Sequence, residues 1–310
     1  MAKYDCVFCG TATYDLLFLV DKVPSSDQRI KALHKLESGG GPAATAAVAL
    51  QKLGMKTALI SAIGDDDIGK KIYEELKEYN IDLTELKIMP GRISPFSVIH
   101  VEKNSGKRAI THYGGCLKFL DPTLINKDIL MDTSMIHLDA NRFALAIEIA
   151  YYTKTKTKAK VSLDGGNISA DHLFQILPFV DILIIDEKTI KNAFTFNLLK
   201  EVCETFHEKG PETIVVTQGE NGLTSYYNKE FIKLPAYPVK AVDTTGAGDN
   251  FHGAFLFGYL KGWSLLDNLK FSSAFAALSC TGLGGRNAIP TFEQTRKFIS
   301  FKEISELKKC

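Results

Sequence analysis

The residues best suited to chemistry form a glycine-rich turn near the C-terminus. The turn reads Asp243-Thr244-Thr245-Gly246-Ala247-Gly248-Asp249 and leads into an apolar helical stretch. Bare backbone N–H groups at a helix start, together with the helix dipole, stabilise an anion without a lysine. Asp249 at the same point can take the proton of an alcohol placed beside that anion, as phosphoryl transfer requires. A capping role would also suit Asp249, but it explains neither Asp243 nor the two glycines.

Two glycine patterns resemble nucleotide motifs but lack essential residues. The segment 64–70 has the spacing of a phosphate-binding P-loop, yet Lys71 stands where a magnesium-binding Ser or Thr belongs, and the loop holds three aspartates. The Gly246-x-Gly248 pair lacks the third glycine of a dinucleotide fingerprint, since Phe251 takes that position. We reject both interpretations, and with them a nicotinamide-dependent oxidoreductase.

The elements around the turn indicate an α/β fold. Short apolar runs alternate with helical stretches, which is typical of a mostly parallel sheet with helices on both faces. The expected strands are Met135–Leu138, Val161–Asp164, Ile182–Ile185 and Ile214–Thr217, with further strands at Val7–Gly10, Ile30–Leu36 and Thr57–Ala62. In such a sheet, ligands bind beyond the carboxyl ends of the strands.

Composition narrows the range of partners. With 37 basic and 36 acidic residues the net charge is +1, so we expect neither nucleic acid nor a membrane surface as a partner. The six cysteines are scattered, and we expect buried, inert thiols in a reducing, cytoplasmic compartment. Their positions are Cys6, Cys9, Cys116, Cys203, Cys280 and Cys310.

The sequence resembles the ribokinase-like (PfkB) carbohydrate kinases over almost its whole length. The turn at 243–249 matches the family's C-terminal signature, and Gly40-Gly41-Pro42-Ala43-Ala44-Thr45 with Gly54 downstream matches the N-terminal one. The resemblance implies one kinase domain spanning 1–310, with a small β-sheet lid contributed by about 12–38 and 92–114. It implies ATP and Mg²⁺ as cofactors and leaves room for a homodimer through the lid.

The resemblance also implies roles for matching positions. Asp249 would be the general base, with Gly246, Ala247 and Gly248 as the anion hole. The sugar hydroxyls would be held by Asp15, Gly40, Gly41 and Thr45, where the family commonly has Asn at the last position. Nucleotide contacts would come from Asp186, Thr217, Gly219, Gly222, Ser272, Gly282 and Gly285. A monovalent cation such as K⁺ would lie near Asp243, Thr245, Ser279, Gly284 and Ala288. The family's N-x-x-E element is replaced by Asp186-Glu187-Lys188-Thr189, so Glu187 would serve Mg²⁺ through water.

Three further residues are candidates for substrate contact. Asp139 and Arg142 follow the expected strand Met135–Leu138, at a position where α/β loops carry ligands. His112 falls in the expected lid, either as an ordinary satisfied polar group or as a substrate contact.

Several motifs match most closely the sulfofructose kinases of the family, including DTTGAGDNFHGA and CTGLGGRNAIP. The expected substrate is a ketohexose-type sugar, 6-deoxy-6-sulfofructose ahead of fructose. Fructokinase and ribokinase are the alternatives, followed by nucleoside kinase. A sugar-binding regulator without catalysis is disfavoured by the intact Asp249 and glycine turn.

Overall fold

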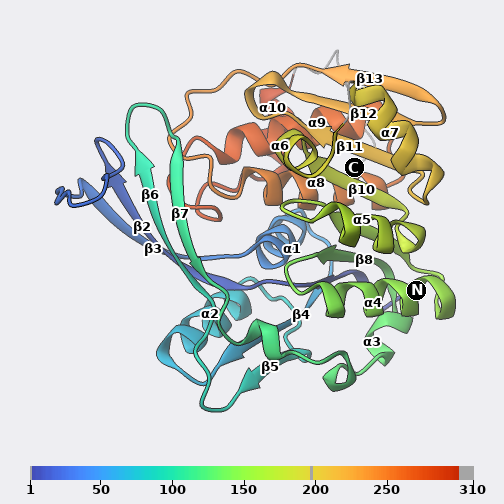
Figure 1. Ribbon diagram of the computed structural model, residues 1–310, viewed down its shortest axis with the longest axis horizontal. Helices are drawn as coiled ribbons and strands as arrows, with labels where there is room; N and C mark the ends of the chain where they lie inside the picture. The colour runs from blue at the N-terminus through green and yellow to red at the C-terminus, as the bar shows by residue number, and fades with distance from the viewer. Residues whose placement is uncertain (1, 196–197, 300–310) are drawn as a thin grey trace.

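The computed structural model describes residues 2–195 and 198–299 and is built on one large twisted sheet (Figure 1). Strands β1, β4, β5, β8, β9, β10 and β11 run parallel, and β12 and β13 complete one edge as an antiparallel pair. The spatial order is β13 (Glu230–Leu234), β12 (Leu223–Tyr227), β11 (Thr213–Thr217), β10 (Ile182–Asp186), β9 (Lys160–Asp164), β8 (Thr133–Asp139), β1 (Tyr4–Cys9), β4 (Thr57–Gly64) and β5 (Leu86–Met89).

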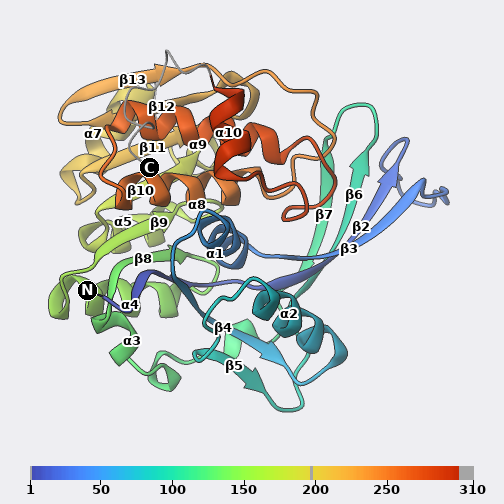
Figure 2. The same cartoon turned by 180° about the vertical axis from the view of Figure 1, so that it is seen from behind.

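Helices cover both faces of this sheet, as Figures 1 and 2 show from opposite sides. One face carries α1 (Pro42–Lys52), α2 (Asp67–Glu78), α8 (Ala247–Leu260), α9 (Leu265–Ser279) and α10 (Phe292–Phe298). The other carries α3 (Asp128–Met131), α4 (Phe143–Lys156), α5 (Ala170–Ile176), α6 (Glu187–Ala193) and α7 (Leu199–Glu208). Neighbouring strand residues such as Val7 and Phe8 enter opposite cores, so the strands are apolar on both sides.

A second, four-stranded sheet projects from the large one as a lid (Figure 1). Its order is β3 (His34–Gly40), β2 (Thr13–Val20), β6 (Phe96–Glu102) and β7 (Arg108–Tyr113). Its two outer pairs are antiparallel, while β2 and β6 run parallel. The base of the lid leads directly into the glycines that precede α1.

The expected α/β class and parallel sheet are confirmed, with two corrections. The strand expected at Ile30–Leu36 is wrong in position, because β3 spans His34–Gly40 and pairs Gly39 and Gly40 with Tyr14 and Thr13. The edge strand β5 was not expected at all. The five cysteines within the described residues are free and buried, and Cys310 lies outside those residues.

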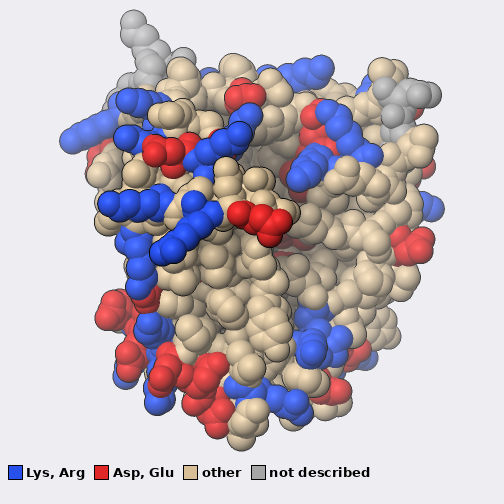
Figure 3. Space-filling model, turned by 60° about the vertical axis from the view of Figure 1, so that its left-hand side comes forward, with Lys and Arg blue, Asp and Glu red and all other residues tan. Residues whose placement is uncertain are grey.

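The face that carries the lid has both basic and acidic side chains and, in the part of the chain that the structure describes, no large patch of one sign. Figure 3 shows Lys, Arg, Asp and Glu interspersed around a largely uncharged centre. Among the helices of the described residues, none is long and apolar enough to cross a bilayer.

Candidate active site

The glycine turn forms the start of α8. Gly246 is its N-cap residue with a φ of 72°, and a β-carbon there would collide with the backbone of Gly285. Glycine is therefore required both by the left-handed conformation and by the close approach. Gly248 is exposed and Asp249 lies in the first helical turn. The N–H of Ala247 donates to the Thr244 carbonyl at 3.3 Å, so the N–H groups that follow it supply the positive end of this fourteen-residue helix beside a carboxylate.

Asp249 shares this end of the sheet with carboxylates from adjacent strands. Asp139 ends β8, Asp164 ends β9 and Asp186 ends β10, and Asp139 lies opposite Asp164 in the strand register. Burial raises the pKa of Asp249 to about 7, and the negative charges of Asp164 and Asp139 act in the same direction. A carboxyl with a pKa near neutrality is well matched to accepting a proton from an alcohol.

A buried histidine pair lies beneath Asp249. His252 is 5% exposed, and its Nε2 lies 3.5 Å from Oδ1 of Asp164. Burial favours neutral His252, but the charges of Asp164 and Asp249 outweigh it and raise the pKa of His252. The same ion pair lowers the pKa of Asp164 to about 2 against the effect of burial. The neighbouring His137, with ring centroids 5.0 Å apart, has its pKa lowered by burial to about 3 and stays neutral.

Asp139 is a structural anchor in this arrangement. It is 3% exposed and accepts hydrogen bonds from the backbone N–H groups of Thr11 (2.6 Å), Asn141 (3.2 Å) and Ala43 (3.3 Å). These bonds tie the end of β1 and the start of α1 to β8. Burial raises the pKa of Asp139 to about 6. Its oxygens are therefore committed to the backbone, and direct contact with a sugar stays a prediction.

The predicted sugar-binding residues gather where the lid meets α1. Asp15 is 7% exposed, accepts a hydrogen bond from Thr13 Oγ1 at 2.9 Å, and lies against Gly40 so closely that a β-carbon there would collide with it. Burial raises the pKa of Asp15, whereas a hydrogen bond from Ser97 lowers it. Ser97 Oγ also lies 3.2 Å from Nδ1 of His112 on β7. The structure thus brings Asp15, Gly40 and His112 into one polar corner.

The lid also reaches the glycine turn. Arg108 of β7 donates from Nη1 to Thr244 Oγ1 at 2.6 Å, and Thr244 donates to the carbonyl of Gly106 at 3.3 Å. The positive charge of Arg108 opposes the rise that burial causes in the pKa of Asp249. The lid hairpin therefore places a cation beside the proposed anion hole.

At the predicted monovalent-cation site, the glycine turn is hydrogen-bonded to the loop that follows α9. Asp243 is 1% exposed and accepts hydrogen bonds from the N–H groups of Thr245 (2.8 Å) and Gly284 (2.9 Å). Thr245 Oγ1 is buried and has no hydrogen-bond partner among the described residues. Such an orphaned oxygen fits a cation ligand. Ser279 Oγ instead donates to the carbonyl of Ala276 at 2.8 Å.

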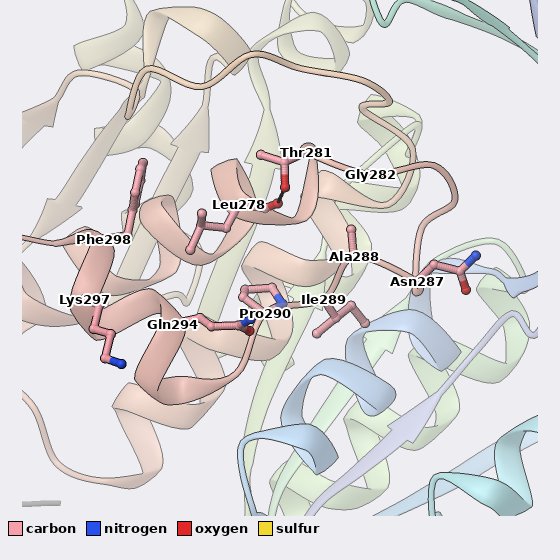
Figure 4. A pocket seen from close by; sticks show the side chains of 10 residues that line it. All are labelled: Leu278, Thr281, Gly282, Asn287, Ala288, Ile289, Pro290, Gln294, Lys297 and Phe298. Carbon is pink, nitrogen blue, oxygen red and sulfur yellow. Dashed lines mark hydrogen bonds between the residues drawn. The ribbon is translucent and has the colours of Figure 1, made fainter.

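Gly282 and Ala288 lie close together, since a β-carbon on Gly282 would meet the side chain of Ala288. They line a surface pocket between α9 and α10 whose side chains come from both helices and the loop joining them (Figure 4). Its other lining residues are Leu278, Thr281, Asn287, Ile289, Pro290, Gln294, Lys297 and Phe298.

Some of the predicted nucleotide-binding residues lie in the loop after β11, whereas others are buried in or after α9. Thr217 ends β11 opposite Asp186, and Gly219 and Gly222 adopt positive φ in the loop that follows. Ser272 lies inside α9 with no exposed surface and donates to Asn268, so the structure does not place it on a nucleotide-binding surface. Gly285 is buried against the glycine turn.

The acidic pair expected near magnesium is already bonded within the protein. Both oxygens of Asp186 accept from Thr189 as the cap of α6, at 2.8 and 2.7 Å. Glu187 pairs with Lys191 at 2.6 Å and accepts from Gln218 at 2.8 Å. Within the described residues, no cluster of three or more His, Cys, Asp or Glu is arranged to hold a metal ion.

Two predicted substrate residues lie outside the polar corner. Thr45 is 1% exposed, and its hydroxyl accepts from Arg286 Nε at 3.2 Å, so it supports the glycine loop from below. Arg142 is the N-cap residue of α4 but makes no side-chain capping bond. Hydrogen bonds from Thr123 lower the pKa of Asp121, and the positive charge of Arg142 acts in the same direction. The Nε of Arg142 is buried without a hydrogen-bond partner among the described residues.

Sequence reasoning missed Asp164, His252, Arg108 and Arg286. Asp164 had a usable signal, because it ends an expected strand and a Gly-Gly pair follows it. The other three are recognisable only from contacts between segments far apart in the chain.

Comparison with known proteins identifies the family of the chain. The family model described as "pfkB family carbohydrate kinase" matches residues 3–292. A ribokinase from Dictyostelium discoideum is 31% identical over 91% of this chain and 96% of its own length. The crystal structure of a putative ribokinase from Agrobacterium tumefaciens superposes with a TM-score of 0.87 at 27% identity, covering 95% of this chain and 97% of that one.

An Arabidopsis thaliana ribokinase complexed with ribose and ATP shares the fold, with a TM-score of 0.82 at 24% identity over 96% of this chain and 99% of that one. The fold, the glycine turn at the start of α8 and the family match all lead to one conclusion. The chain belongs to the PfkB family of carbohydrate kinases.

Proposed function

We propose that this kinase transfers the γ-phosphate of ATP to a hydroxyl of a ketohexose-type sugar, with 6-deoxy-6-sulfofructose preferred to fructose. The observation that carries the proposal is a carboxyl of raised pKa, Asp249, in the first turn of α8, whose N-cap Gly246 packs on Gly285 while the next residue, Arg286, bonds to Gly40 beside Asp15. Fructokinase or ribokinase activity is the alternative, with a nucleoside acceptor third.

In the proposed reaction, Asp249 accepts the proton of the sugar hydroxyl while the hydroxyl oxygen attacks the γ-phosphorus. The bond from phosphorus to the bridging oxygen breaks and ADP leaves. The N–H groups of 246–248 stabilise the charge on the transferred phosphoryl group, and Arg108 adds a cation from the lid. Asp15 orients the sugar through its carboxylate.

Mg²⁺ would be held mainly by the ATP phosphates and water, since Asp186 and Glu187 are already bonded. The ion would neutralise phosphate charge. K⁺ fits the buried pair Asp243 and Thr245, where one hydroxyl oxygen lacks a partner among the described residues.

Arg142 is the residue that favours a sulfonated substrate in this proposal. A sulfonate is a permanent anion, and a guanidinium offers it two parallel hydrogen bonds. The buried, unpartnered Nε of Arg142 is a donor still to be satisfied within the described part of the chain. His112 would add a neutral donor near the same sugar.

The test is an ADP-release assay on ribose, fructose and 6-deoxy-6-sulfofructose. Arg142→Met should lose about ten- to a hundredfold in kcat/KM on the sulfosugar, because a hydrogen bond to a charged group contributes about 1.5–3 kcal/mol. Fructose activity should change little. Arg296→Met on α10 removes the same charge and serves as control. Equal losses on both sugars, or a wild-type preference for fructose, would contradict the sulfosugar assignment and favour the fructokinase alternative.

The lid also suits a homodimer, which we propose on its exposed apolar side chains. Leu33, Ile110 and Tyr113 are 46, 49 and 47% exposed. Light scattering across a hundredfold dilution series tests this, and a monomer at every concentration would contradict it.

A further inference from the structure

Arg286 is buried completely, which is unusual for an arginine. It lies in the loop between α9 and α10 and is 0% exposed. Removing a charged group from water costs several kcal/mol unless good partners replace the water. A well-packed apolar side chain would fill the same space at lower cost. The position of this charge therefore needs an explanation beyond core packing.

The partners of Arg286 lie at or next to the Gly39–Gly41 loop. Nη2 donates to the carbonyl of Gly40 at 2.5 Å, and Nε donates to Thr45 Oγ1 at 3.2 Å. Nη1 lies 3.4 Å from Oε1 of Glu75 on α2. The guanidinium thus joins the end of β3, the first turn of α1 and the last part of α2.

The contact with Gly40 fixes the orientation of a peptide group. In a trans peptide the C=O and the following N–H point in opposite directions. Because Arg286 holds the Gly40 carbonyl on one side, the N–H of Gly41 is directed to the other. The positive charge of Arg286 also lowers the pKa of Asp15, the carboxylate that packs on Gly40.

The residues just before Arg286 are attached to the phosphate end of the site. Gly284 donates from its N–H to Asp243 at 2.9 Å, and the Gly285 carbonyl accepts from Asn250 Nδ2 at 2.9 Å. Asp243 belongs to the glycine turn and Asn250 to the first turns of α8. Three consecutive residues therefore connect the anion hole to the sugar loop.

We propose that Arg286 is a positioning residue that holds the Gly40–Gly41 loop at a fixed place relative to the anion hole. The inference rests on the proposed function only in assigning that loop to the sugar. Arg286 touches no reacting atom. Losing it releases the Gly40 peptide and weakens sugar binding, while the start of α8 and the nucleotide loop keep their own bonds.

The first test separates sugar binding from catalysis. Arg286→Met should raise the KM for the sugar about ten- to a hundredfold, since two hydrogen bonds from a charged donor are lost, with the KM for ATP within about twofold. Arg286→Lys should fall between, because an ammonium cannot hold two separated acceptors as a planar fork does. Arg296→Met is the matched control. An unchanged sugar KM in Arg286→Met would overturn the proposal.

The second test needs no substrate. Hydrogen exchange followed by mass spectrometry should show faster exchange in 38–46 of Arg286→Met, with the peptides of β8 to β11 unchanged. Faster exchange throughout the protein would indicate a merely structural role and refute the inference. If Arg286→Met does not fold, Glu75→Gln, which removes only the counter-charge, should raise sugar KM and local exchange to a smaller extent. Unchanged behaviour of Glu75→Gln would then count against the proposal.

The two proposals fail in different ways. Asp249→Asn should lower kcat and leave the sugar KM nearly constant, the reverse of Arg286→Met. A wild-type enzyme inactive on ribose, fructose and 6-deoxy-6-sulfofructose would refute the substrate assignment, while the exchange experiment would still decide the role of Arg286.

Discussion

The pH dependence of turnover follows from the environment of Asp249. Only the ionised carboxylate can accept the sugar's proton, and its pKa is raised to about 7. We therefore expect kcat/KM to rise with pH through a midpoint near 7 and to level off above about 8. At pH 6 only about a tenth of the enzyme would be in the active form, and at pH 5 about a hundredth.

Replacing His252 should move this midpoint upward. His252 lowers the pKa of Asp249, as does Arg108 from β7, while Asp164 and Asp139 raise it. Residues three apart on a helix have β-carbons about 5–6 Å apart, where unit charges interact by roughly 3 kcal/mol at an effective dielectric constant of 20. Solvent screening reduces this figure, so we expect His252→Gln to shift the midpoint by about one pH unit.

ADP should be quantified directly by chromatography, because coupling enzymes have pH dependences of their own. His207→Gln on α7 loses a histidine far from the glycine turn and is the control. A wild-type profile that is flat from pH 5.5 to 8 would refute the role of Asp249 as base. A downward or absent shift in His252→Gln would refute the electrostatic role of His252.

Three further predictions concern the glycine turn. Asp249→Asn should lower kcat by about 10²–10⁴-fold in a rapid-quench assay. Because the pKa of Asp249 is raised, its ionisation destabilises the folded state, and the variant should be more stable than wild type at pH 8 by at most about 4 kcal/mol. A lower melting temperature of the variant would contradict this. Gly248→Val should fold normally, because a β-carbon there meets no atom within 4 Å, yet turn over poorly because its side chain would occupy the phosphate position; normal turnover would place the phosphate elsewhere. K⁺ should raise activity over tetramethylammonium in wild type and not in Thr245→Val, and equal rates in both salts would remove the cation site.

The local patterns of the sequence were sufficient to predict most of the fold. Strands such as β9 and β11 are continuous apolar runs between helices, and they end at the expected residues Asp164 and Thr217. The shifted position of β3 has a physical cause. Gly39 and Gly40 carry no strand propensity and adopt strand structure only because β2 pairs with them.

Only those parts of the site whose residues are close together in the sequence were predictable. Asp249 and Gly246 lie in one turn, so their cooperation is visible in the sequence. Arg286 and Thr45 are 241 residues apart, and no periodicity links them. Burial likewise determines the pKa of Asp249, and burial is a property of the folded chain.

The bond between Arg108 and Thr244 has a consequence for how ATP is conserved. Arg108 belongs to the lid, so its charge acts on Asp249 only while the lid hairpin lies against the glycine turn. If the lid hairpin left the glycine turn, Asp249 would lose a cation that favours its ionised form, and the proposed anion hole would lose a positive neighbour. A smaller fraction of Asp249 would then be ionised at neutral pH, and a phosphoryl group at the start of α8 would be less stabilised. By this reasoning, transfer of the phosphoryl group to water would be slower while the lid hairpin is away from the glycine turn.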